Sequence, residues 1–211
     1  MFLKQVEVGL MQNFNYLIGC PVTKECAIVD PAWEPDRMLK LAEEEGYRVT
    51  KILLTHNHFD HIEGVPFIRE KTDAVVYIHS LDEASILRGK KVPREKVVNV
   101  PEGFAFKIGQ LSVQCLHTPG HTPGCTCYLV EDQHLFTGDT LFQGTCGRCD
   151  LPGSSPKDLY NSLQRLASLD PVIKVYPGHD YGNRTITSIG YEREHNPALK
   201  GKTFQEFDRL P

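Results

Sequence analysis

The 211-residue sequence predicts an α/β (α+β) protein in which two mixed β-sheets pack face to face with helices outside, a four-layer αββα sandwich. Short apolar runs of strand length alternate with helical patterns along the chain. The first half reads as strands, a helix, a strand and further helices, and the second half as a run of strands followed by a helix, a strand and a helix. Because no linker, low-complexity segment or short repeat divides the chain, we expect a single domain over residues 1–211.

Each expected element has a local signal. Apolar runs predict the strands, and helical spacing of apolar residues predicts the helices. One helix has a clear start, with Ser155 as the N-cap and Pro156 at the first helical position. The expected strands are Phe14–Ile18, Cys26–Val29, Lys51–Leu54, Ala74–Ile78, Lys96–Val100, Phe104–Ile108, Leu111–Leu116, Cys125–Val130, His134–Thr137 and Val172–Tyr176. The expected helices are Glu34–Glu45, Ile62–Lys71, Ser80–Leu87, Pro156–Ser168 and Ile186–His195.

Composition and charge exclude several classes of protein. The chain is 40% hydrophobic and 24% charged, with a formal net charge of −4 and no lysine/arginine block, so a nucleic-acid partner is not expected. Residues 1–19 are interrupted by Lys4, Gln5, Glu7 and Asn13, unlike a signal peptide or a membrane span of about 20 apolar residues. We therefore expect a cytoplasmic protein without a membrane partner. Whether it is a monomer or a homodimer stays open.

The cysteines are expected to be thiols. Seven is an odd number, which a complete set of disulfides cannot use, and their scatter suits a reducing compartment. Cys146 and Cys149 form one C-x-x-C pair that could be a redox or zinc pair or simply two loop residues. No second pair of this spacing completes a four-thiolate zinc site, which favours the loop interpretation.

The strongest chemical signal is the segment Thr55-His-Asn-His-Phe-Asp-His61, directly after the expected strand Lys51–Leu54. In extended chain, residues two apart point to the same side, so His56 and His58 can converge on one ion. If the chain then enters a helix near Ile62, Asp60 and His61 can face a second ion. The alternative to a metal-binding segment is a solvent-exposed histidine-rich loop.

Three other segments repeat one pattern, in which a strand is followed by glycine and then by a potential ligand. They are Thr118-Pro-Gly-His121, Thr137-Gly-Asp139 and Tyr176-Pro-Gly-His179. Glycine lets the backbone turn sharply and brings the next side chain close to an ion. Strand ends that carry His or Asp in this way predict a site at one rim of the sheet sandwich.

These motifs together resemble the metallo-β-lactamase superfamily, and within it the glyoxalase II (hydroxyacylglutathione hydrolase) branch. The resemblance extends over nearly the whole chain, from Ile28-Val-Asp30 to His179. It implies one metal at His56, His58 and His121, and a second at Asp60, His61 and His179, with Asp139 bridging both. It also matches Asp30 to an aspartate behind the metal loops, for which a strand-terminating turn residue is an equal alternative.

The donor set is chemically suited to this arrangement. Imidazoles and carboxylates bind zinc, iron or manganese, and we expect two divalent ions, with zinc preferred. Two ions about 3.5–4 Å apart can share a hydroxide and polarise a carbonyl. The expected enzyme is therefore a metallo-hydrolase with a metal-bridging hydroxide as nucleophile, in which Asp60 and Asp139 are the catalytic carboxylates. The chain contains neither a G-x-S-x-G elbow nor a Walker loop.

The resemblance also suggests a small-molecule thioester of the S-acylglutathione type as substrate. In that branch a basic residue at the position of Arg148 and a tyrosine at that of Tyr181 contact the thiol carrier; a surface cation and a packing aromatic are the alternatives. Two departures weaken the match to glutathione. Asp150 stands where glyoxalase II has an aromatic, and the short stretch after His179 predicts that the full C-terminal glutathione-binding helical domain is absent. Short bacterial hydrolases of the branch look more similar.

A second reaction class remains open. The chain also resembles the persulfide dioxygenases of the same fold, whose single iron would be held here by His56, His121 and Asp139, a facial triad with open positions. A non-enzymatic metal-binding scaffold is a third, weaker hypothesis.

The remaining histidines are expected to be structural (His79 and His117, at strand ends) or solvated (His134 in a hairpin turn and His195 in a helix).

Overall fold

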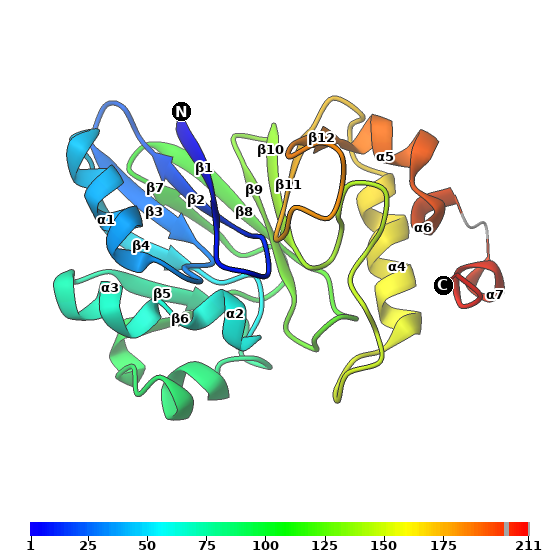
Figure 1. The fold of residues 1–211 in the computed structure, drawn as a ribbon, viewed down its shortest axis with the longest axis horizontal. Coiled ribbons are helices and arrows are strands. Elements are labelled where there is room, and N and C mark those ends of the chain that lie inside the picture. The colour runs from blue at the N-terminus through cyan, green and yellow to red at the C-terminus, as the bar shows by residue number, and fades with distance from the viewer. Residues whose placement is uncertain (201–202, 211) are drawn as a thin grey trace.

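The computed structural model describes residues 1–200 and 203–210, and it confirms the four-layer sandwich (Figure 1). The first sheet has the order β1 (Phe2–Val8), β2 (Asn13–Gly19), β3 (Glu25–Val29), β4 (Arg48–Leu53), β5 (Val75–Ile78) and β6 (Val97–Asn99). The second has the order β12 (Thr187–Ser188), β11 (Lys174–Pro177), β10 (His134–Gly138), β9 (Thr126–Val130), β8 (Leu111–His117) and β7 (Ala105–Ile108). Both sheets are mixed, because β3 to β6 and the pair β10–β11 are parallel and the other neighbours are antiparallel.

Helices cover the outer faces of the two sheets, as Figure 1 shows. On one side lie α1 (Pro35–Glu44) and α3 (Val65–Lys71), and on the other α4 (Pro156–Ala167), α5 (Ile189–His195) and α6 (Pro197–Lys200). Three short helices complete the set: α2 (Phe59–Ile62), α7 (Phe204–Phe207) and the 3₁₀ turn η2 (Arg94–Lys96), with a π-helical turn η1 at Ser85–Gly89. The side chain of Ser155 accepts a hydrogen bond from Asp158 N, which confirms the expected cap of α4.

Strand β2 shows why the sandwich forms. All of its residues are buried, and successive side chains point to opposite faces of the sheet. Tyr16 and Ile18 pack in the core between the two sheets, and Leu17 packs in the layer between the first sheet and its helices. A strand that is apolar on both faces must be covered on both, and this requirement places a sheet on one side and helices on the other.

Some boundaries differ from the sequence prediction. The first strand, β1, was not predicted, whereas the expected strand Phe14–Ile18 lies within β2. The helix expected at Ile62–Lys71 begins earlier and breaks at Gly64, where a Cβ would lie 2.7 Å from the carbonyl oxygen of Pro31. The helix expected at Ser80–Leu87 is a turn followed by η1. The break at Gly64 comes from its close contact with Pro31, which the spacing of apolar residues along the sequence does not reveal.

One histidine assignment was wrong. His134 begins β10, and its Nδ1 lies 2.8 Å from the hydroxyl oxygen of Tyr176, so it is part of the structure rather than a solvated turn residue. His195 is exposed, as expected. His79 and His117 stack on each other, with ring centroids 4.1 Å apart, and join the ends of β5 and β8 across the two sheets.

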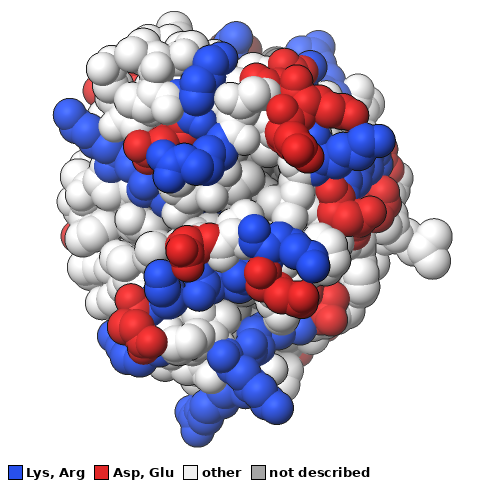
Figure 2. Space-filling view, turned by 90° about the vertical axis from the view of Figure 1, so that its left-hand side faces the viewer, with Lys and Arg blue, Asp and Glu red and all other residues white. Residues whose placement is uncertain are grey.

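The outer face that carries α1 and α3 has a mixed charge pattern. Figure 2 shows lysine and arginine interspersed with aspartate and glutamate, without a broad area of one sign. Within the described residues, no helix is long and apolar enough to cross a membrane.

Candidate metal centre

The structure brings all seven predicted metal ligands to one rim of the sandwich. They lie on loops that follow β4, β8, β10 and β11. Strands β8, β10 and β11 run in the same direction, so their loops leave the second sheet at the same edge. An isolated bridge between Asn13 and His179 joins that edge to the first sheet.

Three imidazoles form the first cluster, which we call the imidazole subsite: His56, His58 and His121. Their ligand atoms all lie within 4.8 Å of one another, and His58 Nδ1 is 2.9 Å from His121 Nε2. His56 and His58 are neighbours in extended chain, as the spacing predicted. His121 reaches them from the second sheet, so this subsite forms only when the two sheets are packed.

The second cluster, the carboxylate subsite, contains Asp60, His61 and His179. Helix α2 includes Asp60 and His61, so both lie on its first turn. His61 Nε2 is 3.0 Å from His179 Nε2, and each of these atoms is 3.4 Å from Asp60 Oδ2. This cluster again takes ligands from both sheets.

Asp139 lies between the two clusters. Its Oδ1 is 3.3 Å from His61 Nε2, and its Oδ2 is 3.5 Å from His121 Nε2 and 3.4 Å from His179 Nε2. One carboxylate therefore contacts imidazoles of both subsites, which is the position that a bridging ligand needs.

Hydrogen bonds on the far side of the rings orient the imidazoles. When Nδ1 of a neutral imidazole donates a hydrogen bond, Nε2 keeps a free lone pair. In four of the five rings, Nε2 is the nitrogen that faces the centre of the cluster. His58 presents Nδ1 instead. The acceptors are Asp30 Oδ2 for His61 (3.0 Å), Met11 O for His179 (2.8 Å), Arg148 O for His121 (2.8 Å) and Thr55 Oγ1 for His56 (3.0 Å).

These residues fit divalent cations. His56 Nε2 and Asp139 Oδ1 are buried and have no hydrogen-bond partner. Buried polar atoms without partners are costly. A cation in each subsite would satisfy all of these atoms, and imidazole with carboxylate is a donor set for zinc, iron or manganese.

The two subsites differ in their acid–base properties. Burial, together with His121, lowers the pKa of His58 to about 4, and burial with His61 lowers that of His56. Burial also acts to lower the pKa of His179, but the carboxylates of Asp139 and Asp60 outweigh it and raise the value to about 10. Without cations, His56 and His58 are neutral and His179 is protonated at neutral pH.

Asp30 supports the rim from behind, and it also ends β3. Its Oδ1 accepts a hydrogen bond from Thr55 N (2.7 Å), and its Oδ2 accepts from Thr55 Oγ1 (2.6 Å) and His61 Nδ1 (3.0 Å). Its φ of 45° lies in the left-handed region, which non-glycine residues seldom adopt. Such strain persists where surrounding contacts fix the residue, as they do here.

Two supporting residues were missed by the sequence analysis. Asn13 Nδ2 lies 3.0 Å from Asp60 Oδ2 and holds that carboxylate in place. Asp82 is fully buried and accepts hydrogen bonds from Thr122 Oγ1 and Gly124 N in the loop of His121. Neither residue belongs to a recognisable motif, since both reach the site through tertiary packing.

The predicted substrate residues lie beside the centre. Tyr181 stacks on the ring of His179, with centroids 4.7 Å apart, and is 51% exposed. The carbonyl of Arg148 holds His121, but its exposed guanidinium makes two bonds of 2.6 Å to the carboxylate of Asp150. A free cation for a substrate carboxylate is therefore not present at Arg148.

Cys146 and Cys149 are free thiols next to this segment. Burial raises their pKa values to about 12 and 11, which disfavours the thiolates that bind metal. Among the described residues neither thiol joins a metal-ligand cluster, in keeping with two loop residues.

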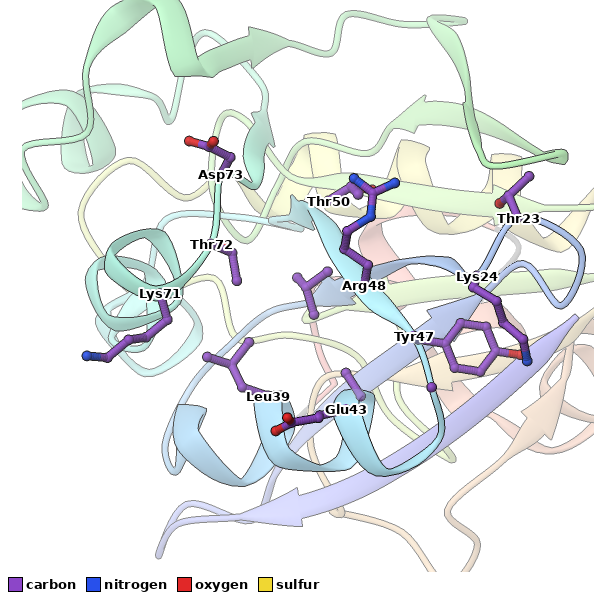
Figure 3. Close-up of a pocket in the computed structure, with 13 residues that line it drawn as sticks. Thr23, Lys24, Leu39, Glu43, Tyr47, Arg48, Thr50, Lys71, Thr72 and Asp73 are labelled. Carbon is purple, nitrogen blue, oxygen red and sulfur yellow. The ribbon is translucent and has the colours of Figure 1, made fainter.

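A surface hollow lies away from the metal centre. It measures about 940 Å³ and contains Arg48 at the start of β4, whereas the metal loop follows the end of that strand. Figure 3 shows its charged side chains, such as Lys71, Glu43 and Arg48, pointing in different directions. It contains none of the predicted site residues.

Comparison with known proteins identifies the family. The model of the metallo-beta-lactamase superfamily matches residues 8–179. The chain belongs to this superfamily, and its relatives are consistent with the glyoxalase II-like branch.

The relatives include more than one kind of enzyme. A probable polyketide biosynthesis zinc-dependent hydrolase of Bacillus velezensis is 35% identical over 176 residues, 83% of this chain and 76% of the relative. A hydroxyacylglutathione hydrolase of Methylobacterium nodulans is 39% identical over 170 residues (80% and 63%). The crystal structure of ETHE1 from Myxococcus xanthus superposes with a TM-score of 0.85 at 36% identity, covering 100% of this chain and 92% of that one. The human mitochondrial persulfide dioxygenase ETHE1 is 30% identical over 202 residues (94% and 76%).

Proposed function

We propose that this chain is a two-metal hydrolase of thioesters of the S-acylglutathione type, with zinc as the preferred metal. The observation that carries the proposal is the place of Asp139, whose carboxylate contacts His121 of the imidazole subsite and His61 of the carboxylate subsite. A bridging carboxylate between two complete ligand sets is the arrangement required for two neighbouring ions.

When bound, a pair of divalent cations lowers the pKa of water and polarises a carbonyl oxygen. The chain's own residues prepare the rest. Asp30, Met11 and Arg148 hold the imidazoles with their lone pairs inward. Burial acts to raise the pKa of Asp60, but His179, His61 and Asn13 outweigh it and keep the carboxylate ionised. Asp60 is therefore held as an anion, the form in which a carboxylate would bind a cation in the carboxylate subsite.

The surroundings suit an acyl group on a thiol carrier. Phe59 and Met11, 59% and 40% exposed, provide apolar surface next to the ligands, and Tyr181 lies on the ring of His179. The similarity to a hydroxyacylglutathione hydrolase supports a glutathione thioester. The Arg148–Asp150 pair removes one cationic contact, so we expect modest discrimination between glutathione and other thiol carriers.

The test combines metal analysis with turnover. Protein purified without added metal is analysed for zinc, iron and manganese, then assayed with S-lactoylglutathione and with the same acyl group on N-acetylcysteamine. We expect close to two ions per chain and release of free thiol from both. A protein that contains two zinc ions and releases no thiol from either would contradict the proposal.

A second function is favoured by the similarity to ETHE1 over the whole chain. In this alternative one iron is held by His56, His121 and Asp139, and the protein is a persulfide dioxygenase. One iron per chain together with oxygen uptake on glutathione persulfide would establish it and exclude the hydrolase. In both cases the partner is a small molecule.

A further inference from the structure

We propose that Asp82 is a positioning residue that sets the geometry of the imidazole subsite by holding the loop that carries His121. Asp82 lies outside the ligand set, in the turn between β5 and η1, and is fully buried. The proposal rests on the proposed metal pair, and it concerns the affinity of one ion rather than the reaction.

The Asp82 carboxylate is held by the loop that carries His121. Thr122 Oγ1 donates to Oδ2 at 2.6 Å, and Gly124 N donates to Oδ1 at 3.0 Å. Thr122 directly follows the ligand His121. A Cβ at position 124 would lie 2.5 Å from Asp82 Cγ, so this glycine is needed for the carboxylate to approach the backbone.

Burial raises the pKa of the Asp82 carboxyl, and hydrogen bonds from Thr122 and Gly124 oppose that rise, with a smaller contribution from the backbone amide of Asn57, between His56 and His58. The hydrogen bonds of Asp82 therefore fix the loop of His121, one of the three ligands of the imidazole subsite. No hydrogen bond joins Asp82 to Asp60, His61 or His179 among the described residues.

Asp30 has the corresponding role for the carboxylate subsite. Asp30 bonds directly to His61 of the carboxylate subsite and reaches His56 only through the hydroxyl of Thr55. A buried carboxylate with several donors is rigid, and rigid outer partners preorganise the ligands that they hold. Loss of Asp82 should therefore weaken binding at one subsite and spare the other.

The experiment measures Zn²⁺ affinity in two backgrounds, each of which keeps a single subsite. His179→Ala leaves the imidazole subsite, and His58→Ala leaves the carboxylate subsite. Metal-free proteins are titrated with Zn²⁺ against a chromophoric chelator. We expect Asp82→Ala to raise the Kd about 10- to 100-fold in the His179→Ala background and to leave it unchanged in the His58→Ala background.

Matched variants separate positioning from folding. Thr122→Val should weaken the same subsite and Thr122→Ser should restore it, because serine keeps the hydroxyl. Ser85→Ala removes a hydrogen bond to the carbonyl of Asp82 (2.8 Å) without touching its carboxylate, and should have no effect. Should Asp82→Ala fail to fold, Asp82→Asn and the Thr122 pair carry the test.

An equal loss of affinity in both backgrounds, or none in either, would overturn the role of Asp82. A wild-type chain that binds two ions, with unchanged affinities in the Asp82 and Thr122 variants, overturns this role alone. A wild-type chain that never binds a second ion overturns the proposed two-metal site and this role with it.

Discussion

The imidazole and carboxylate subsites are neighbours that share Asp139, yet they are built differently. One presents His121 with two rings, His56 and His58, whose pKa values burial lowers, and the other presents the carboxylate of Asp60 and a histidine, His179, with a raised pKa. His56, His58 and His121 would hold an ion in the imidazole subsite without a carboxylate of their own, so that ion would keep more of its positive charge and polarise a carbonyl more strongly.

The largest effect on activity should come from removing Asp139, the residue that the two subsites share. Asp139→Ala removes the only carboxylate that contacts both ligand sets in the described structure. We expect kcat for thioester hydrolysis to fall at least about a thousandfold, equivalent to about 4 kcal/mol, with loss of at least one ion by elemental analysis. The exposed Asp73→Ala is the control. Normal turnover and metal content in Asp139→Ala would rule out the bridge.

A smaller loss of Zn²⁺ affinity should be confined to the carboxylate subsite. Asn13→Ala removes the amide that lies 3.0 Å from Asp60 Oδ2. We expect the Zn²⁺ Kd of this subsite to rise about tenfold, without change at the imidazole subsite, when measured in the single-subsite backgrounds described above. Asn183→Ala, in an exposed loop, should leave both values unchanged. Equal changes at the two subsites would mean that they do not act separately.

The subsites should also differ in proton release. At pH 7.5 the metal-free His179 is protonated because its pKa is about 10, whereas His58, with a pKa of about 4, is neutral. Binding of Zn²⁺ needs an unprotonated ring, so the carboxylate subsite should release at least the proton of His179, whereas His58 should release almost none.

Calorimetry in buffers of different ionisation enthalpy measures this number in each background. The affinity of the carboxylate subsite should rise as the pH is raised toward 10, because His179 then loses its proton, whereas titration of His58 should not change the affinity of the imidazole subsite near neutral pH. Equal proton release from the two subsites would show that they do not differ in the protonation of their metal-free histidines.

The smallest effect concerns substrate selection beside the imidazole subsite. Asp150→Asn frees the guanidinium of Arg148 from its ion pair, so the KM for S-lactoylglutathione should fall a few-fold while kcat is unchanged. The N-acetylcysteamine thioester has no carboxylate and should show no change. A KM that is unaltered for both substrates would exclude Arg148 from recognition of the carrier.

Much of the fold and of the candidate site could be predicted from local sequence. His56 and His58 are two residues apart in extended chain, and Asp60 and His61 begin a helical turn, so the relation within this segment is nearly local. Gly120, with a φ of 144°, shows the sharp turn expected before His121. The strand-end pattern predicted a site at one rim, but the division of the ligands between two metals came from the similarity to a family, because sequence distance alone does not say which side chains share an ion.

The remaining features were decided by packing. Asn13 and Asp82 reach the rim from β2 and from the turn after β5, across contacts that join residues 47 and 40 positions apart. The pairing of Arg148 with Asp150 likewise depends on how the loop is folded against His121.

The amino-acid sequence by itself determined which residues could hold cations and that two covered sheets would carry them, since donor chemistry and the periodicity of burial are local properties. Only the tertiary structure decided which ring nitrogen faces the centre and which carboxylate supports which loop. These depend on hydrogen bonds between segments that are distant in the chain and meet only when the two sheets pack.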